Sequence, residues 1–596
     1  MNILFAASEV APFIKTGGLA DVAGSLPPAL VDAGHDVRVI LPLYEGISQE
    51  WRDQMEFVKC WYVRLAWRSV YCGIFRLVRG GVTYYFVDNE FYFKRNGLYG
   101  HYDDGERFAY FSRAIIETPA QLNWHPDVIH CNDWQTALAP IYLLEERERT
   151  PQLFGTKSVY TIHNIEYQGR YGQELLSDLF GLDQGYYHEH MLAYHNDINL
   201  MKGAIYAADY VTTVSPTYAE ELQYAFYAHG LEGVIADNKH KLRGILNGID
   251  MEAYNPVTDH VIAANFSADK LDGKAVCKQA LQERLGLSQN PDVPIIACIS
   301  RLVGHKGFEL VASAFHRIME RDVQFVLLGT GEWGYEQFFR DMQGQYPGRV
   351  SANIMYSGAL SSAIYAGADL FLMPSISEPC GLSQMIAMRY GTVPIVRETG
   401  GLKDTVSPYV ISTGEGRGFT FADINIDDMV YVIHQALDTY EYKDAWHKIM
   451  VRDMQADFSW DRSAQAYMEV YSWITWLSPN PKEEAARKAA EEQARIAAET
   501  EAARKAAEEE AQKVKTAEEV QAPAAEAEPV EEAVPEETPQ TEAVSAPAEP
   551  EVEPAKPAPK KRTTTRKAAA GTKKTTAAKK SSAAKKKAAK SETPEK

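Results

Sequence analysis

The sequence predicts an α/β protein with two doubly wound domains and a charged, low-complexity tail. Short apolar runs rich in β-branched residues alternate with amphipathic segments, which is typical of parallel strands buried on both faces and connected by helices. A similar glycine-containing string occurs in each half of the chain, as Thr16-Gly17-Gly18-Leu19-Ala20-Asp21 and as Thr399-Gly400-Gly401-Leu402-Lys403-Asp404. Each copy follows a strand-like run, where a turn can bring backbone amides to an anion at a helix start.

Nine apolar runs are expected to form the strands of the two parallel sheets. In chain order they are Ile3–Ala7, Val37–Leu41, Val128–His130, Ser158–His163, Tyr210–Val214, Ile295–Ser300, Val323–Leu328, Leu370–Pro374 and Pro394–Val396. Between Val58 and Val87, alternating aromatic residues predict a hairpin that adds antiparallel strands to the first domain.

An Asn-Gly turn marks the predicted boundary between the two domains. Asn247 and Gly248 end the first series of strands, and a connector with proline and asparagine follows. We therefore expect a first domain over residues 1–246 and a second over residues 247–455. Residues 456–478 are aromatic and amphipathic, so we expect a closing helix that packs back on the body.

The tail, residues 479–596, differs in composition from the body. Opposite charges three and four positions apart favour a solvated helix over residues 482–516. Residues 521–559 are rich in proline, glutamate and alanine and are expected to be disordered. Residues 481–554 carry a net charge of −13 and residues 555–596 one of +13, so the body holds the whole formal charge of −20.

An acidic body is not expected to bind nucleic acid or anionic membranes in general. Nucleic acid is a candidate partner only for the lysine-rich end of the tail, through counterion release. The alternative is a solvated tail that folds back on the acidic residues. The sequence leaves the oligomeric state open.

The six cysteines are scattered without a CxxC pair, mostly among apolar neighbours. This pattern indicates reduced, partly buried thiols and suggests no zinc or iron–sulfur site. The first residues enter a strand-like run directly, and no apolar stretch approaches the length of a membrane span. We therefore expect a cytoplasmic protein that needs neither a metal ion nor a cofactor.

The first glycine loop begins with a cation. Lys15 precedes Thr16, and the following Gly17 and Gly18 leave no Cβ between their amides and a ligand. Taken alone, the loop is a weak signal and is better explained as a tight turn with a surface lysine.

Two cations follow the predicted strand at residues 295–300. Arg301 and Lys306 flank Gly304 at the carboxyl end of this strand, where open α/β sheets bind ligands. A guanidinium can grip phosphate oxygens with its fork, and an ammonium can neutralise another oxygen. A cationic loop in each domain favours a phosphorylated ligand shared by both.

A third loop runs from Pro374 to Gln384. A bend at Pro379 and Gly381 would let the next amides head a helix and face a phosphate. Glu378 then lies at the loop tip, where a carboxylate suits a sugar hydroxyl or a developing positive charge. The alternative is an ordinary charge at a helix N-terminus.

Together with two further motifs, these loops resemble the bacterial glycogen synthases and plant starch synthases. The resemblance covers about residues 1–478 and leaves the tail outside it. The motifs that carry it are Lys15-Thr16-Gly17-Gly18-Leu19-Ala20-Asp21-Val22, Ile129-His130-Cys131-Asn132-Asp133-Trp134-Gln135, Tyr160-Thr161-Ile162-His163-Asn164, Ser300-Arg301 with Lys306-Gly307, and Ser377-Glu378-Pro379-Cys380-Gly381-Leu382. One departure is His305, where many relatives have glutamine, but the two cations keep their spacing.

The resemblance implies two Rossmann-like lobes of the GT-B architecture, facing a central cleft, and a retaining glucosyltransferase of glycogen biosynthesis. Such an enzyme transfers glucose from a sugar nucleotide to the non-reducing end of an α-1,4-glucan. ADP-glucose is the expected donor because the likeness is to bacterial enzymes. The alternatives are a related transferase or phosphorylase on another sugar, and a sugar-binding scaffold with a nucleic-acid-binding tail.

The resemblance also implies the site residues. The expected catalytic residues are Lys15, His163, Arg301, Lys306 and Glu378. The expected substrate-binding residues are Gly17, Gly18, Asp21, Asp133, Asn164, Asn247, Tyr356, Cys380, Gly381, Leu382 and Ser383.

By the family pattern, Arg301 and Lys306 would hold the leaving diphosphate and Glu378 the sugar hydroxyls. His163 would lie at the glucosyl face, and Tyr356 would be a platform for the base. A core histidine and an ordinary helix cap are the alternative explanations for His163 and Asp133.

Overall fold

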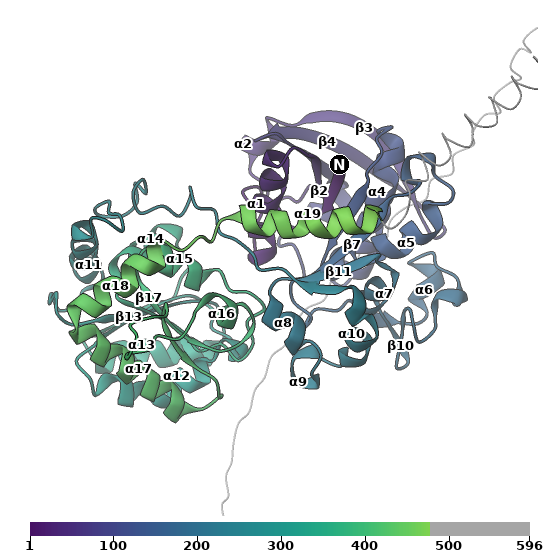
Figure 1. The fold of residues 1–596 in the computed structure, drawn as a ribbon. Coiled ribbons are helices and arrows are strands. Elements are labelled where there is room, and N and C mark those ends of the chain that lie inside the picture. The colour runs from purple at the N-terminus through teal and green to yellow at the C-terminus, as the bar shows by residue number, and fades with distance from the viewer. Residues whose placement is uncertain (477–596) are drawn as a thin grey trace, which may run out of the picture. The chain divides into compact units, whose positions relative to one another are not determined.

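A computed structural model of the chain describes residues 1–476 (Figure 1). The predicted tail and the last two positions of the predicted closing helix lie outside the described residues. Within residues 1–476 the chain forms two parallel-sheet α/β parts, which confirms the predicted fold class. No helix in this range is long and apolar enough to cross a membrane.

The first sheet has nine strands. They are β1 (Asn2–Ala6), β2 (Asp36–Pro42), β3 (Glu56–Leu65), β4 (Arg68–Arg79), β5 (Val82–Asp88), β6 (Val128–Asn132), β7 (Lys157–Ile162), β11 (Tyr210–Thr213) and β12 (Leu242–Gly244). Their order is β12-β11-β7-β6-β1-β2-β5-β4-β3. β1 pairs in parallel with β2 and β6, whereas β4 pairs antiparallel with β3 and β5, as the predicted hairpin requires.

Ten helices and a small sheet accompany the first sheet. The helices are α1 (Gly18–Asp32), α2 (Gln49–Arg52), α3 (Glu90–Phe93), α4 (Asp104–Gln121), α5 (Leu138–Glu146), α6 (Leu175–Asp178), α7 (Leu200–Ala207), α8 (Pro216–Glu221), α9 (Ala225–Ala228) and α10 (Glu232–Asn238). The small sheet consists of β8 (Arg170–Gly172), β9 (Ala193–Tyr194) and β10 (Asp197–Asn199).

The second sheet has six parallel strands. They are β13 (Ile295–Ile299), β14 (Gln324–Leu328), β15 (Val350–Asn353), β16 (Leu370–Met373), β17 (Val393–Arg397) and β18 (Phe419–Phe421), in the order β15-β14-β13-β16-β17-β18. The helices of this part are α11 (Asp272–Leu285), α12 (Phe308–Met319), α13 (Trp333–Gln345), α14 (Gly358–Gly367), α15 (Ser383–Arg389), α16 (Gly400–Thr405), α17 (Ile426–Glu441) and α18 (Lys443–Met454).

Local sequence explains these elements. In α12, Phe308, Val311, Phe315 and Ile318 recur at helical spacing and are all buried, so one face of the helix packs on the second core. α17 starts where the Asn425 side chain accepts hydrogen bonds from the first backbone amides of the helix. Most strand residues of β1, β6, β7, β13 and β14 are buried, as expected when helices cover both faces of a sheet.

The last described helix, α19 (Trp460–Trp476), contacts α1 and β7 of the first part (Figure 1). Its buried Tyr471 places its hydroxyl 2.6 Å from Nδ1 of the fully buried His130 on β6. The helix thus adds aromatic side chains to the first core, although it follows the second sheet in the chain.

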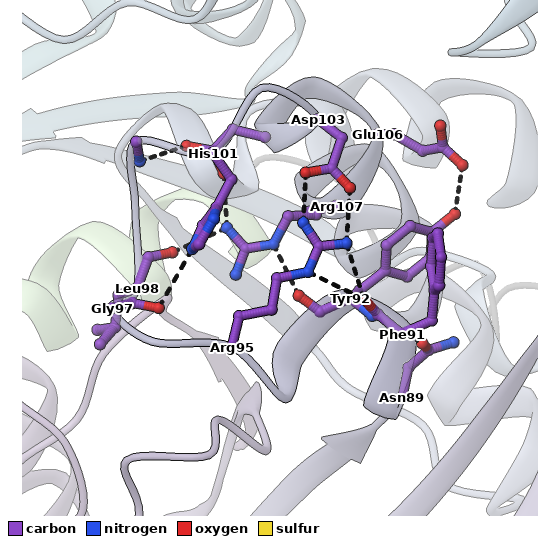
Figure 2. A network of polar contacts seen from close by, with 12 residues as sticks. Asn89, Phe91, Tyr92, Arg95, Gly97, Leu98, His101, Asp103, Glu106 and Arg107 are labelled. Atoms are coloured by element: carbon purple, nitrogen blue, oxygen red, sulfur yellow. Dashed lines mark hydrogen bonds and ion pairs between the residues drawn. The ribbon is translucent and has the colours of Figure 1, made fainter. Parts of the chain in front are cut away.

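A polar network fixes the segment between β5 and α4 (Figure 2). The fully buried Arg107 donates to the carbonyls of Tyr92 and Leu98 at 2.8 and 2.9 Å and to the Asp104 carboxylate at 2.5 Å. These partners offset the cost of burying the Arg107 charge and tie Tyr92, Leu98 and Asp104 together, although Nη2 of Arg107 has no hydrogen-bond partner among the described residues.

Candidate active site

The shortest contact among the predicted catalytic residues joins Lys306 to Glu378. Lys306 closes a single 3-10 turn, η5 (Gly304–Lys306), and its Nζ lies 2.6 Å from Oε2 of Glu378. The side chains expose only 16% and 9% of their surface. Ser375 donates a second hydrogen bond to the same Oε2 atom at 2.9 Å. The carboxylate is therefore shared between a cation and a hydroxyl.

The two loops meet because their strands are neighbours. Lys306 follows β13 and Glu378 follows β16, and these strands pair in parallel, so both loops leave the sheet at its carboxyl edge. The carbonyl of His305 accepts a hydrogen bond from Ile376 at 2.8 Å. Gly307 has a φ of +78°, and a Cβ there would lie 1.9 Å from the carbonyl oxygen of Pro374. Only glycine allows this approach of the two backbones.

Arg301 offers a second, unpaired cation beside this pair. It is exposed and follows β13, and within residues 1–476 its guanidinium has no hydrogen-bond or ion-pair partner. Its charge acts on the nearby His305, whose pKa is lowered by burial and by Lys306 and Arg301. An unpaired, planar guanidinium at a strand end is free to donate two hydrogen bonds to two oxygens of a phosphate.

The loop after Glu378 ends in a helix start, as the sequence predicts. Gly381 has a φ of +76°, Leu382 is the N-cap of α15 and Ser383 is its first residue. Cys380 is buried, and its burial raises the pKa of the thiol to about 12. Cys380 is therefore a packed thiol and not a thiolate at neutral pH.

In the first glycine loop, a carboxylate of the chain already binds the amides. Glu9 accepts hydrogen bonds through Oε2 from the backbone and the hydroxyl of Thr16 and from the Gly17 amide, the last two at 2.9 and 3.2 Å. Burial raises the pKa of Glu9, against these hydrogen bonds. Gly18, the first residue of α1, stays exposed, and a Cβ there would meet nothing within 4 Å. The open side of the loop therefore lies at Gly18.

Lys15 is also paired. Its Nζ lies 2.6 Å from Oδ1 of Asp21, and the side chains expose 40% and 25% of their surface. Tyr254 and Tyr356 are near enough to act on the charge of Lys15. Both residues of this pair were predicted for the site, and the ion pair sets the position from which Lys15 would reach a ligand.

A third cluster joins the predicted residues at the ends of β6 and β7. Oδ1 of Asp133 accepts hydrogen bonds from the amides of His163 and Asn164 at 2.7 and 3.3 Å. Asp133 has a φ of +55°, which places it at a sharp turn after β6. Burial raises the pKa of its carboxyl to about 7 even against these two hydrogen bonds.

The imidazole of His163 is neutral. Its Nε2 lies 2.8 Å from Oδ1 of Asn132, whose amide nitrogen donates to the Ala6 carbonyl at 2.9 Å. Oδ1 of Asn132 is therefore an acceptor, which makes Nε2 of His163 the donor. Burial lowers the pKa of His163 to about 3. Its Nδ1 atom is left without a proton.

Asn247 and Tyr356 lie in contrasting environments. Asn247 is 6% exposed, and among the described residues its buried Oδ1 atom has no hydrogen-bond partner. The Asn247 backbone hydrogen-bonds Cys380. Tyr356 is 90% exposed, between β15 and α14. An exposed ring can stack on a base without displacing the fold.

Three groups of predicted residues are thus formed: the Lys306 and Glu378 pair, the Lys15 and Asp21 pair, and the Asp133 cluster. Within residues 1–476 no hydrogen bond or ion pair joins one group to another. Their assignment to one substrate stays a prediction. No group of three His, Cys, Asp or Glu side chains in this part of the chain is placed to hold a metal ion.

Sequence reasoning missed three carboxylate and hydroxyl groups at these loops. Glu9 follows β1 closely, and that position at a strand end could have indicated it. Ser215 and Glu221, which contact the loops at Pro379 and Gly400, carry no local signal in the sequence.

Comparisons with known proteins show the family of the chain. Residues 2–237 match the starch synthase catalytic domain, and residues 282–450 match the glycosyl transferases of group 1. The chain is 50% identical over 474 residues to a glycogen synthase of Geobacillus thermodenitrificans, covering 80% of this chain and 98% of that one. It is 49% identical over 475 residues to a glycogen synthase of Clostridium novyi, covering 80% and 99%.

Two solved structures have a similar fold. The catalytic domain of starch synthase IV from Arabidopsis thaliana, bound to ADP and acarbose, is 37% identical with a TM-score of 0.74 and covers 80% of this chain and 99% of that chain. Sucrose-phosphate synthase from Thermosynechococcus elongatus, 17% identical with a TM-score of 0.51, covers 80% and 100% and shares the fold alone. The identities and the matched lengths show that the chain belongs to the glycogen synthase and starch synthase family of GT-B glycosyltransferases.

Proposed function

We propose that the chain transfers glucose from ADP-glucose to the non-reducing end of an α-1,4-glucan, with retention of configuration. The observation that carries this proposal is the arrangement of Arg301, Lys306 and Glu378 at neighbouring strand ends. An unpaired guanidinium and an ammonium lie beside a carboxylate, so anion and sugar sites adjoin. The related starch synthase bound to ADP and acarbose supports the choice of donor and acceptor.

Breaking the sugar–phosphate bond separates charge. The diphosphate gains negative charge as the sugar becomes oxocarbenium-like, so the site must stabilise both ends. Arg301 and Lys306 would hold the departing diphosphate through charged hydrogen bonds. Each such bond is worth about 1.5–3 kcal/mol, or roughly 10- to 150-fold in rate if it tightens in the transition state.

Glu378 and His163 would stabilise the sugar as it gains positive charge. Glu378 would accept hydrogen bonds from glucosyl hydroxyls while it remains bound to Lys306. His163 is neutral, so it adds no positive charge against the developing cation. We favour departure of the diphosphate and attack by the acceptor on the same face of the sugar, since this gives retention without a covalent intermediate.

A donor-competition assay tests the proposal. The full chain is incubated with a glucan primer and either ADP-glucose or UDP-glucose, and glucan length and nucleotide release are followed. We expect glucan extension with release of one ADP per glucose and slower extension from UDP-glucose. Extension from glucose 1-phosphate alone, or shortening of the glucan by orthophosphate, would instead identify a phosphorylase.

A further inference from the structure

The second glycine string, at residues 399–404, does not present free amides to a ligand. Glu221, the last residue of α8, accepts hydrogen bonds from the hydroxyl of Thr399 at 2.8 Å and from the amide of Gly400, 3.1 Å from each carboxylate oxygen. Glu221 is 8% exposed and Thr399 is fully buried. The anion at the start of α16 is thus a side chain from the first half of the protein, 178 residues away in the chain.

The α8 segment forms hydrogen bonds to the second half of the chain at two more places. The hydroxyl of Ser215, its N-cap, donates to the Pro379 carbonyl at 2.6 Å. Thr217 donates from its amide and its hydroxyl to the Asp404 carboxylate at 2.9 and 2.7 Å. One short helix therefore holds both ends of α16 and the loop that carries Glu378.

The glycine string in turn supports the Glu378 loop. The amide of Gly401 donates to the Pro379 carbonyl at 3.2 Å, the same oxygen that Ser215 contacts. Gly400 has a φ of +43°, and a Cβ there would lie 2.0 Å from the carbonyl oxygen of Glu378. The backbone at Glu378 and Pro379 therefore rests directly on the string that Glu221 binds.

A third support comes from β17. Arg397, 3% exposed, donates from Nε to the Ser375 carbonyl at 2.7 Å and from Nη2 to the Ile376 carbonyl at 2.5 Å. Arg397 fixes the start of the loop, and the Thr399–Gly400 string fixes its centre. The Glu221 carboxylate holds the string itself through Thr399 and Gly400.

From these contacts we infer that Glu221 is a positioning residue: by binding Thr399 and Gly400 it sets the place of Glu378 opposite the transferred glucose. The inference rests on the proposed glucosyl transfer. It gives the second copy of the string a role beside the active-site loop, since its Gly400 amide binds the Glu221 carboxylate. A misplacement of about 1 Å can cost about 100-fold in rate, so removal of Glu221 is expected to lower turnover more than substrate affinity.

The test uses full-length chain with Glu221→Ala, Glu221→Gln, Thr399→Val and the control Glu220→Ala. Glu220 is the exposed neighbour of Glu221 on the same helix. We measure kcat, KM for ADP-glucose and for the glucan, and Tm. For Glu221→Ala we expect kcat to fall at least about tenfold, with both KM values within about twofold of the wild type. Glu221→Gln keeps a carbonyl acceptor and is expected to restore kcat to within about threefold of the wild type.

The outcomes separate the inference from the proposed function. If the wild type does not extend glucan, the proposed function fails, and the inference falls with it. If the wild type is active and Glu221→Ala keeps wild-type kcat, or lowers only Tm, Glu221 is a packing residue and the inference is wrong. An equal loss of kcat in Glu221→Gln also contradicts it. If Glu221→Ala does not fold, Thr399→Val decides: a fall of at least about threefold in kcat supports the inference, and wild-type kcat overturns it.

Discussion

Nζ of Lys306 lies 2.6 Å from Oε2 of Glu378, and both side chains are largely buried. The cation predicted to hold the donor diphosphate is therefore neutralised by the carboxylate predicted to hold the sugar. Arg301, by contrast, has no ion-pair partner within residues 1–476. The two cations should therefore respond differently to substitution.

Arg301→Ala should impair transfer without weakening the fold. Removing a charged hydrogen bond to the diphosphate is expected to lower kcat/KM at least about tenfold. Tm should stay within about 1 °C of the wild type, because no described partner loses a contact. Steady-state kinetics and thermal unfolding check this, with Arg284→Ala on α11 as an exposed control. Wild-type turnover in Arg301→Ala would remove this residue from the site.

Lys306→Ala should impair both transfer and stability. The substitution leaves the buried Glu378 carboxylate without its cation, a change that typically costs about 3–5 kcal/mol in a buried pair. We expect at least about a tenfold loss of kcat/KM and a lower Tm. The double variant Lys306→Ala, Glu378→Gln should melt above Lys306→Ala, because it removes the stranded charge.

A double-mutant cycle on the Lys306 and Glu378 variants measures this coupling. The exposed Lys448→Ala on α18 controls for loss of a lysine. Tm shifts that simply add, with the double variant melting lowest, would show that the pair is not energetically coupled.

Asp133→Asn should change how stability depends on pH. The folded carboxyl has a pKa of about 7, above the usual 3.8, so the folded state binds more protons between these values. The contribution of Asp133 to the free energy of unfolding of the wild type is therefore lost as pH rises from about 4 through 7. The slope is below about 1.4 kcal/mol per pH unit, because Asp133 is partly exposed.

Asparagine keeps the oxygen that accepts from His163 and Asn164 but cannot ionise. The Tm difference between Asp133→Asn and the wild type should therefore move in favour of the variant from pH 5 to pH 8. Thermal unfolding at the two pH values measures it, and Asp269→Asn in an exposed turn is the control. A difference independent of pH would mean that Asp133 titrates normally.

For Lys274→Met, the stability difference should change with pH in the opposite direction: the wild type should gain on the variant as pH rises. Lys274 on α11 is 6% exposed, and its Nζ donates to the Tyr390 carbonyl and the Thr392 hydroxyl, both at 2.8 Å. Burial lowers the pKa of Lys274 from 10.5 to about 7. The unfolded state binds the extra proton between these values, so stability falls as pH drops from about 10.5 to 7.

The wild type should gain stability from pH 7 to pH 9 relative to Lys274→Met, by up to about 1.4 kcal/mol per pH unit. Urea unfolding of both proteins at each pH checks this, with the exposed Lys270→Met as control. Parallel stability curves for wild type and Lys274→Met would contradict the lowered pKa.

Much of the fold could be predicted because buried parallel strands leave a clear signal. All nine predicted runs form strands, with ends shifted by one or two residues. Within residues 1–476, six strands were missed: β12, β15 and β18, which are edge strands of three or four residues, and β8, β9 and β10 of the small sheet, which have two or three residues. Such short runs carry little periodicity. The predicted boundary at residue 247 stays a prediction.

The site was predictable only in part. The sequence placed Lys306 and Glu378 each after a strand, but their contact depends on the pairing of β13 with β16, which the sequence did not predict. The side-chain carboxylates that bind the two glycine strings could not be predicted from the sequence. Glu9 and Glu221 bind these strings through tertiary placement, and the sequence instead suggested a phosphate at both.

A crystal structure of the full chain with ADP-glucose and a short α-1,4-glucan tests the central claim most directly. The account predicts that the diphosphate lies within hydrogen-bond distance of Arg301 and Lys306, with Glu378 on the glucosyl hydroxyls. A diphosphate bound away from both cations would contradict it.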